Sequence, residues 1–492
     1  MSMMRLMTGR MYHQAAFLVR GHTGAALIAE YCVGIKQIER QIIMVKSEIK
    51  LSDHFTYGRL LRFVLPSVIM MIFTSIYNMV DGLFVSNFAG KEAYSAINIV
   101  MPVMIMLSCV GFMFGTGGSA VVAKTLGEGE REKADRYFSM FVYVTFAIGV
   151  IILIAGQIVM EPVVGLLGAT GKVKYWAVIY GRINICSLPF FMLQVAFQSF
   201  YNSAGKPVLG LVSTIITGVG NMVLDALFVV GFGWGLPGAA LATSICEGIG
   251  GLIPIVYFVR KNTSNLRLGK PSHDVRVLFR GAFNGISEFM TNIASSIVAI
   301  LYNLQLIRLI GQSGVAAYGT MQYVGFLFAA VFMGYSLGSS AIISFNHGAQ
   351  NYPELRNIYL KSIRLIAVTG VVMFLLAELS GRAVVGFFVG YDSELMKLTL
   401  GGYRIYSIVF LMWGFNIFAS SLFTALNNGM LSALISMLRT LVFEIAMIFL
   451  LPLVFGAGGI WAAAPMADFL ALIISVSLIM ANRKRYHYGR DL

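Results

Sequence analysis

Twelve long apolar segments follow one another along this chain between about residue 60 and residue 481. They lie near 60–84, 94–118, 137–159, 175–200, 207–231, 237–258, 280–307, 315–340, 361–380, 397–424, 430–453 and 458–481. About 20 apolar residues in a helix cross a bilayer, and a helix satisfies its own backbone hydrogen bonds in lipid. The pattern therefore predicts an all-α integral membrane protein with twelve transmembrane helices.

The composition excludes other classes of protein. Of the 492 residues, 58% are hydrophobic and 12% are charged, whereas soluble proteins have about 25% charged residues. A soluble enzyme, a disordered chain and a fibrous protein are thus ruled out for the main body. The net charge of +14 would indicate nucleic acid in a soluble protein, but here we attribute it to loops that face anionic lipid. We expect the bilayer as a partner, no nucleic acid, and a monomer.

The cysteines and histidines indicate no resident metal or cofactor. The sequence has four cysteines and six histidines, without a CxxC pair, and every histidine falls in a tail or loop. Neither a disulfide framework nor a zinc site follows from these spacings.

Lysine and arginine predict the orientation. If both termini are cytoplasmic, the inner segments hold 27 basic residues and the outer segments hold 6, with 3 arginines inside spans. Short cytoplasmic loops are enriched in basic residues. We therefore expect a multi-pass protein of the cell inner (plasma) membrane with its N-terminus and C-terminus in the cytoplasm.

The chain also repeats itself at an offset of 221 residues. Residues 117–120 (GGSA) recur as 338–341 (GSSA), and Gly127 recurs as Gly348. Because each half has an even number of spans, the halves are parallel, and they form two pseudo-symmetric six-helix lobes. We expect an N-terminal extension (1–43), an N-lobe with spans 1–6 (44–258), a cytoplasmic linker (259–279), a C-lobe with spans 7–12 (280–482) and a basic cytoplasmic tail (483–492). The extension differs in composition from the rest, and we expect translation to start at Met44.

Ionisable residues inside the spans are the strongest functional signal, because a charge at the bilayer centre costs about 2.5–3.5 kcal/mol on insertion scales. Asp81 lies late in span 1, with Tyr77 one turn earlier on the same face, and Asp225 lies late in span 5, one turn after Asn221. Two carboxylates in one apolar lobe must gain a proton or surround a cation. Na⁺ at Asp81, Asn221 and Asp225 is consistent with these oxygen ligands. Pro66 is a candidate for bending the first helix.

The C-lobe lacks this pair, because the offset places Tyr302 opposite Asp81 and Ala446 opposite Asp225. It carries other charges within its spans, and these are candidates for ion pairs or for contact with a substrate. They are Glu288, Arg439 and Glu444, with Met290 as a candidate cavity residue. In a regular α-helix Arg439 and Glu444 are about 140° apart and would not share a face.

Together these residues resemble the multidrug and toxic compound extrusion (MATE) family. The likeness rests on Pro66 with Tyr77 and Asp81, on the Asn221-x-x-x-Asp225 spacing and on the duplicated glycine-rich ends of spans 2 and 8. The sequences of residues 51–55 and 287–292 are similar to those of its prokaryotic DinF/MepA-like branch. The resemblance covers about residues 44–482.

The resemblance implies secondary active multidrug efflux by alternating access, with inward Na⁺ or H⁺ exchanged for organic cations or amphiphilic compounds. It implies a first-lobe cation site at Tyr77, Asp81, Tyr180, Gln198, Asn221, Asp225 and Thr243. Gln198 stands where the family tends to carry asparagine, and Glu247 stands where we expect glutamine. Glu288 resembles an acidic residue that other branches use in the second lobe.

The residues within the spans also distinguish two alternative functions. A lipid-linked oligosaccharide flippase of the same superfamily is the alternative, but three arginines against six acids within the spans favour a cationic cargo. An intramembrane enzyme would need a histidine, a metal or a Gly-x-Asp motif at membrane depth, and the spans show none. We therefore expect a transporter and not an enzyme, with Na⁺ or H⁺ as the coupling ion and no cofactor.

Overall fold

The computed structural model describes residues 49–488 except 89, 90 and 391. All the helices described here lie within Leu51–Leu492. The expected extension, including Met44, lies outside the described residues.

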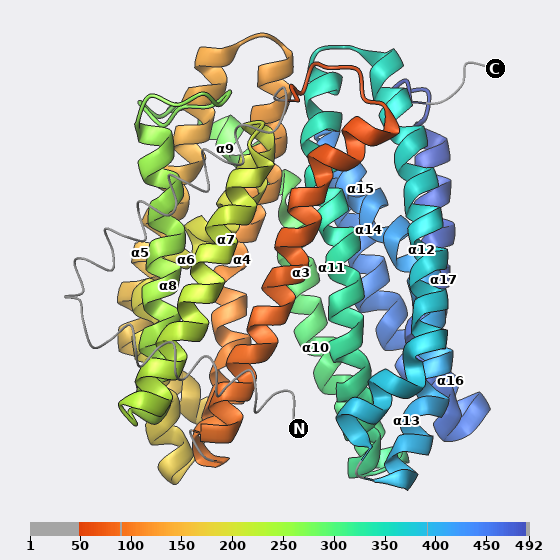
Figure 1. Cartoon of the computed structure of the whole chain (residues 1–492). Helices are drawn as coiled ribbons and strands as arrows, with labels where there is room; N and C mark the ends of the chain where they lie inside the picture. Colours follow the sequence, from red (N-terminus) through yellow and green to blue (C-terminus); the bar gives the residue numbers. More distant parts are fainter. Residues whose placement is uncertain (1–48, 89–90, 391, 489–492) are drawn as a thin grey trace. The chain divides into compact units, whose positions relative to one another are not determined.

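The long helices of the N-lobe follow one another in chain order (Figure 1). They are α3 (Tyr57–Phe88), α4 (Lys91–Gly127), α5 (Arg131–Leu166), α6 (Gly171–Ser203), α7 (Pro207–Asp225), which continues as a π-helix (Ala226–Gly231), and α8 (Gly235–Val259). Each has an apolar stretch long enough to cross a membrane. The six spans predicted for this lobe are confirmed.

The C-lobe repeats this order with more interruptions (Figure 1). Its elements are α10 (Ile286–Leu309), α11 (Gln312–Gly348), α12 (Tyr352–Val389), α13 (Ser393–Tyr406), α14 (Phe410–Ala425), α15 (Gly429–Met437), α16 (Glu444–Phe455) and α17 (Ala463–Asn482). A short 3₁₀ turn joins α13 to α14, and a π-helix, Leu438–Phe443, joins α15 to α16.

Eleven candidate membrane spans are found among the described residues, because Gly429–Asn482 counts as one helical stretch of 54 residues. At 1.5 Å per residue that stretch would be about 80 Å long, far more than a bilayer of about 30 Å. It turns back at Gly456, whose φ of 61° suits glycine, and α16 packs against α17. The stretch thus makes two crossings, and the prediction of twelve holds.

The start of the C-lobe differs from the prediction. The span expected at 280–307 begins only at Ile286, because a separate ten-residue helix, α9 (Val275–Asn284), precedes it. Asp274 caps α9 by accepting hydrogen bonds from two backbone amides. Leu266 and Val277 are buried in the N-lobe core, so the segment between the lobes packs against the N-lobe.

The lobes meet through glycines that obey the repeat. A Cβ on Gly127 would lie 2.0 Å from the Phe345 carbonyl oxygen, and a Cβ on Gly348 would lie 2.0 Å from that of Lys124. The two contacts are exchanged by the offset of 221, which places Lys124 opposite Phe345. Side chains strengthen this end, since the Ser344 hydroxyl donates to the Ala120 carbonyl over 2.6 Å. The lobes are therefore closed against each other where α4 and α11 end.

Candidate functional site

Asp225 is the most completely buried carboxylate of the N-lobe. Its side chain is 0% exposed, and neither carboxylate oxygen has a hydrogen-bond partner. It ends α7 directly before the π-helix Ala226–Gly231. Single π turns inside α-helices occur frequently at functional sites. An unpartnered buried carboxylate costs several kcal/mol, so this position calls for a proton or a cation.

Asp81 faces Asp225 from α3. The two carboxyl groups lie close enough for their charges to interact, and one oxygen of Asp81 is also buried without a partner among the described residues. Ionised carboxylates only accept hydrogen bonds, so two of them are bridged only when a proton or a cation lies between them. The sequence placed these two residues together, and the structure does so as well.

Neutral oxygens and aromatic rings surround this pair. The Asn221 amide donates to the Thr243 hydroxyl over 3.4 Å, and Tyr180, which is 3% exposed, lies close enough to interact with both aspartates. Tyr77 packs against Gly218 of α7 and interacts with Asp81. Four helices, α3, α6, α7 and α8, thus contribute to one polar cluster.

Gln198 does not join this cluster. It lies 18 residues after Tyr180 on α6, which is about 27 Å along the helix axis. The glutamine of α6 that reaches α7 is Gln194, whose amide donates to the Thr217 hydroxyl over 3.5 Å and whose oxygen is buried without a partner. Both glutamines lie on α6, and the sequence alone does not indicate which of them faces α7.

Glu247 is a third acid beside the pair. It accepts a hydrogen bond of 2.5 Å from the Ser187 hydroxyl, and it interacts with Tyr77, Tyr180 and Asp81. The sequence identified Glu247 as mid-span but did not predict Ser187 as its partner. Among the described residues, no group of three or more His, Cys, Asp or Glu side chains is arranged to hold a metal ion.

Asp468, an acid inside the C-lobe spans, has both a charged and a neutral partner. Asp468 accepts from the Arg439 guanidinium over 2.8 Å and from the Asn416 amide over 2.8 Å. Asn416 in turn accepts from the Ser475 hydroxyl, and Arg439 lies 6.0 Å from the ring centre of Trp413. This network on α14, α17 and the π-helix is internally satisfied.

The expectation that Arg439 and Glu444 lie on different faces is wrong. Residues 438–443 form a π-helix, in which residues five apart come one turn above each other. The two charges interact, and Glu444 also neighbours Tyr302, Tyr318 and Tyr406. A regular α-helix would hold the two residues about 140° apart, and the wider π turn reduces that angle.

The remaining candidates are dispersed. Glu288 lies in the first turn of α10, where it interacts with Arg439 and faces Cys109 of the N-lobe helix α4. Met290 is partly buried two residues later. Pro66 lies inside α3, before Ser67, whose hydroxyl donates to the Asn202 side-chain oxygen over 2.7 Å.

Two parallel six-helix repeats, with a pair of unpartnered buried acids among the described residues of the first, are the architecture of a polytopic transporter. The chain belongs to the MatE family, whose model matches residues 66–227 and 289–450, one match in each repeat.

Named relatives and solved structures extend over most of the chain. The Multidrug export protein MepA of Staphylococcus haemolyticus is 26% identical over 431 residues, covering 86% of this chain and 94% of the relative. MepA of Staphylococcus saprophyticus is 24% identical over 436 residues, covering 87% and 94%. A crystal structure of MATE in complex with MaL6 matches with a TM-score of 0.83 at 20% identity, over 87% of this chain and 97% of that one.

Proposed function

We propose that this protein exports organic cationic or amphiphilic compounds and is driven by the inward movement of Na⁺ or H⁺. The observation that carries the proposal is Asp225, fully buried with both oxygens unpartnered and facing Asp81. The relatives at 24–26% identity are named as multidrug export proteins, which supports the same class of cargo.

Coupling follows from the chemistry of the pair. A cation that enters between Asp81 and Asp225 removes their mutual repulsion and draws α3 toward α7. Asn221, Thr243 and Tyr77 are within the same cluster and would complete an oxygen shell for Na⁺, whereas H⁺ needs only the carboxylates. The protein needs no resident cofactor for this cycle.

Alternating access requires that the cation and the cargo disfavour each other. Such coupling is reciprocal, and about 1–3 kcal/mol, or 5–150-fold in affinity, is typical. With the N-terminus and C-terminus in the cytoplasm, the glycine contacts between α4 and α11 close the cytoplasmic end. The cargo then leaves from the opposite end, and Glu288, Glu444 and Met290 are the C-lobe candidates for touching it.

The test uses purified protein in liposomes loaded with a cationic dye. Dye movement is followed under a Na⁺ gradient alone and under a pH gradient alone. Transport driven by one of the two identifies the coupling ion. Dye movement that ignores both gradients would contradict antiport, and lipid-linked oligosaccharide flipping in the same liposomes would favour the alternative function.

A further inference from the structure

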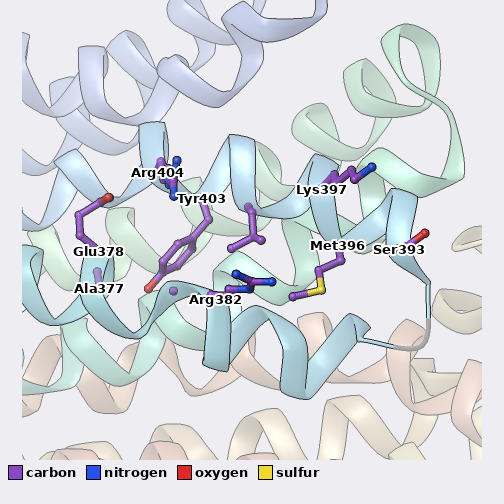
Figure 2. Close-up of a pocket in the computed structure, with 10 residues that line it drawn as sticks. Ala377, Glu378, Arg382, Ser393, Met396, Lys397, Tyr403 and Arg404 are labelled. Atoms are coloured by element: carbon purple, nitrogen blue, oxygen red, sulfur yellow. The ribbon is translucent and has the colours of Figure 1, made fainter.

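A second polar site lies between α12 and α13, at the end of the C-lobe where these helices are joined (Figure 2). It is a cavity of about 320 Å³. Glu378 and Arg382 line it from α12, and Lys397, Tyr403 and Arg404 line it from α13. The cavity lies toward the end of α12 that is remote from the glycine contacts at Gly348, and the N-lobe acids do not line it.

Positive charge dominates this cavity. Within the described part of the chain, Arg382, Lys397 and Arg404 have no ion-pair partner, and all three are exposed. The single acid, Glu378, accepts a hydrogen bond of 2.6 Å from the Ser407 hydroxyl. Tyr403 is 1% exposed, and its hydroxyl has no partner. The cavity thus carries an excess of two positive charges and an unused buried hydroxyl.

The N-lobe fills the same place differently. The offset of 221 puts Glu161 opposite Arg382 and Gln157 opposite Glu378. Glu161 forms an ion pair of 3.3 Å with Lys174 at the start of α6. In the N-lobe, Glu161 therefore neutralises the positive charge at this position. In the C-lobe an arginine, Arg382, replaces the acid, and the position stays positively charged.

The surroundings of the cavity are apolar and open. Leu375, Leu379 and Phe387 of α12 are 50%, 84% and 70% exposed, within a helix of membrane-spanning length. Exposed apolar side chains on such a helix face acyl chains, and basic residues near a leaflet that contains anionic lipid attract its head groups. Arginine suits phosphate because its planar donors bind two oxygens at once.

We propose that the cavity between α12 and α13 binds the phosphate head group of an anionic phospholipid, with Arg382 and Arg404 on the phosphate and Lys397 beside it. The acyl chains then lie along the exposed leucines of α12. This site needs no transport cycle, so the proposal stands or fails independently of the proposed export.

Native mass spectrometry of the purified protein tests the proposal, with phosphatidylglycerol and phosphatidylcholine as probes. Arg382→Glu recreates the acid that the N-lobe uses naturally, so the helix pair should remain folded. We expect this variant to bind phosphatidylglycerol at least tenfold more weakly, because a charge near lipid contributes about 1 kcal/mol and two unit charges change. Arg404→Gln should weaken it about fivefold.

Lys172→Gln is the matched control, since Lys172 is an exposed cation in the first turn of α6, outside the cavity. It should leave binding unchanged. Equal binding of the two lipids, or an equal loss in Lys172→Gln, would overturn the proposal. A third arm adds inorganic phosphate, and its displacement of the bound lipid at millimolar concentration would mean a free-anion site instead.

Discussion

The two lobes share one fold and treat their buried acids in opposite ways. Glu247 and Asp468 occupy matching places, yet Asp468 has an arginine and an amide as partners whereas Glu247 has one hydroxyl. Asp225 has no hydrogen-bond partner in the part of the chain that the structure describes, and its C-lobe counterpart is Ala446. The comparison indicates that Asp468 stabilises the C-lobe through its partners, while Asp225 of the N-lobe is left free for a cation.

The largest expected effect is in the N-lobe. Asp225→Asn should abolish gradient-driven export, because an amide removes the charge that attracts the coupling ion. The folded protein should persist, since an unpartnered buried charge is costly and its neutral isostere is not. Dye efflux from proteoliposomes and thermal unfolding of the same sample measure the two outcomes.

Glu161→Gln is the control for this variant, because Glu161 is an acid of the same lobe that is 57% exposed. It should transport normally. Export by Asp225→Asn at the wild-type rate would end the interpretation of the pair as a cation site, and loss of folding would mean that its carboxylate is structural.

The C-lobe should show the reverse. Asp468→Asn leaves the Arg439 guanidinium without its anionic partner and should lower the free energy of unfolding by about 3 kcal/mol, the lower end for a broken buried ion pair because Glu444 remains nearby and the amide oxygen still accepts a hydrogen bond. Unfolding in a denaturing detergent measures the loss. The double variant Arg439→Met with Asp468→Asn should recover most of it, and failure to recover would show that the network acts through Asn416 instead.

The closed end offers a test of the symmetry between the lobes. Gly348→Ala places a Cβ against the Lys124 carbonyl and should disfavour the closed contact by about 1–3 kcal/mol, as overpacking does. Hydrogen exchange of residues 340–348 should rise. Gly319→Ala, on the same helix with open space around it, should leave that exchange unchanged. Unchanged exchange in both variants would mean that this contact does not hold the lobes together.

Much of the architecture is predictable because membrane spans are set by length and apolarity. The twelve segments and the repeat follow from residues alone, and so does the meeting of Asp81 with Asp225, since both lie late in outward-running spans. The π-helix at 438–443 is not predictable, because it depends on packing and not on composition. It brings Arg439 and Glu444 closer to one side of the helix than the α-helical period of 3.6 residues per turn would.

Side-chain contacts between different helices could not be predicted from the sequence either. The pairing of Arg439 with Asp468 is one of them, because the two residues lie 17 residues before and 12 residues after the turn at Gly456 and the sequence does not show how the two helices align. The choice between Gln194 and Gln198 is another, since it depends on the depth at which α6 packs against α7. The orientation and the coupling ion stay predictions.

The smallest expected effect concerns Glu247, which has one hydrogen-bond partner, whereas Asp225 has none among the described residues and Asp468 has two. Glu247→Gln keeps an oxygen to accept from the Ser187 hydroxyl but exchanges a charged acceptor for a neutral one. That difference is about 1 kcal/mol, so export should fall about fivefold rather than vanish. The initial rate of dye efflux, measured beside Asp225→Asn at several pH values, checks this. A complete loss would place Glu247 in the cation site with the aspartates, and an unchanged rate at every pH would make the bond to Ser187 purely structural.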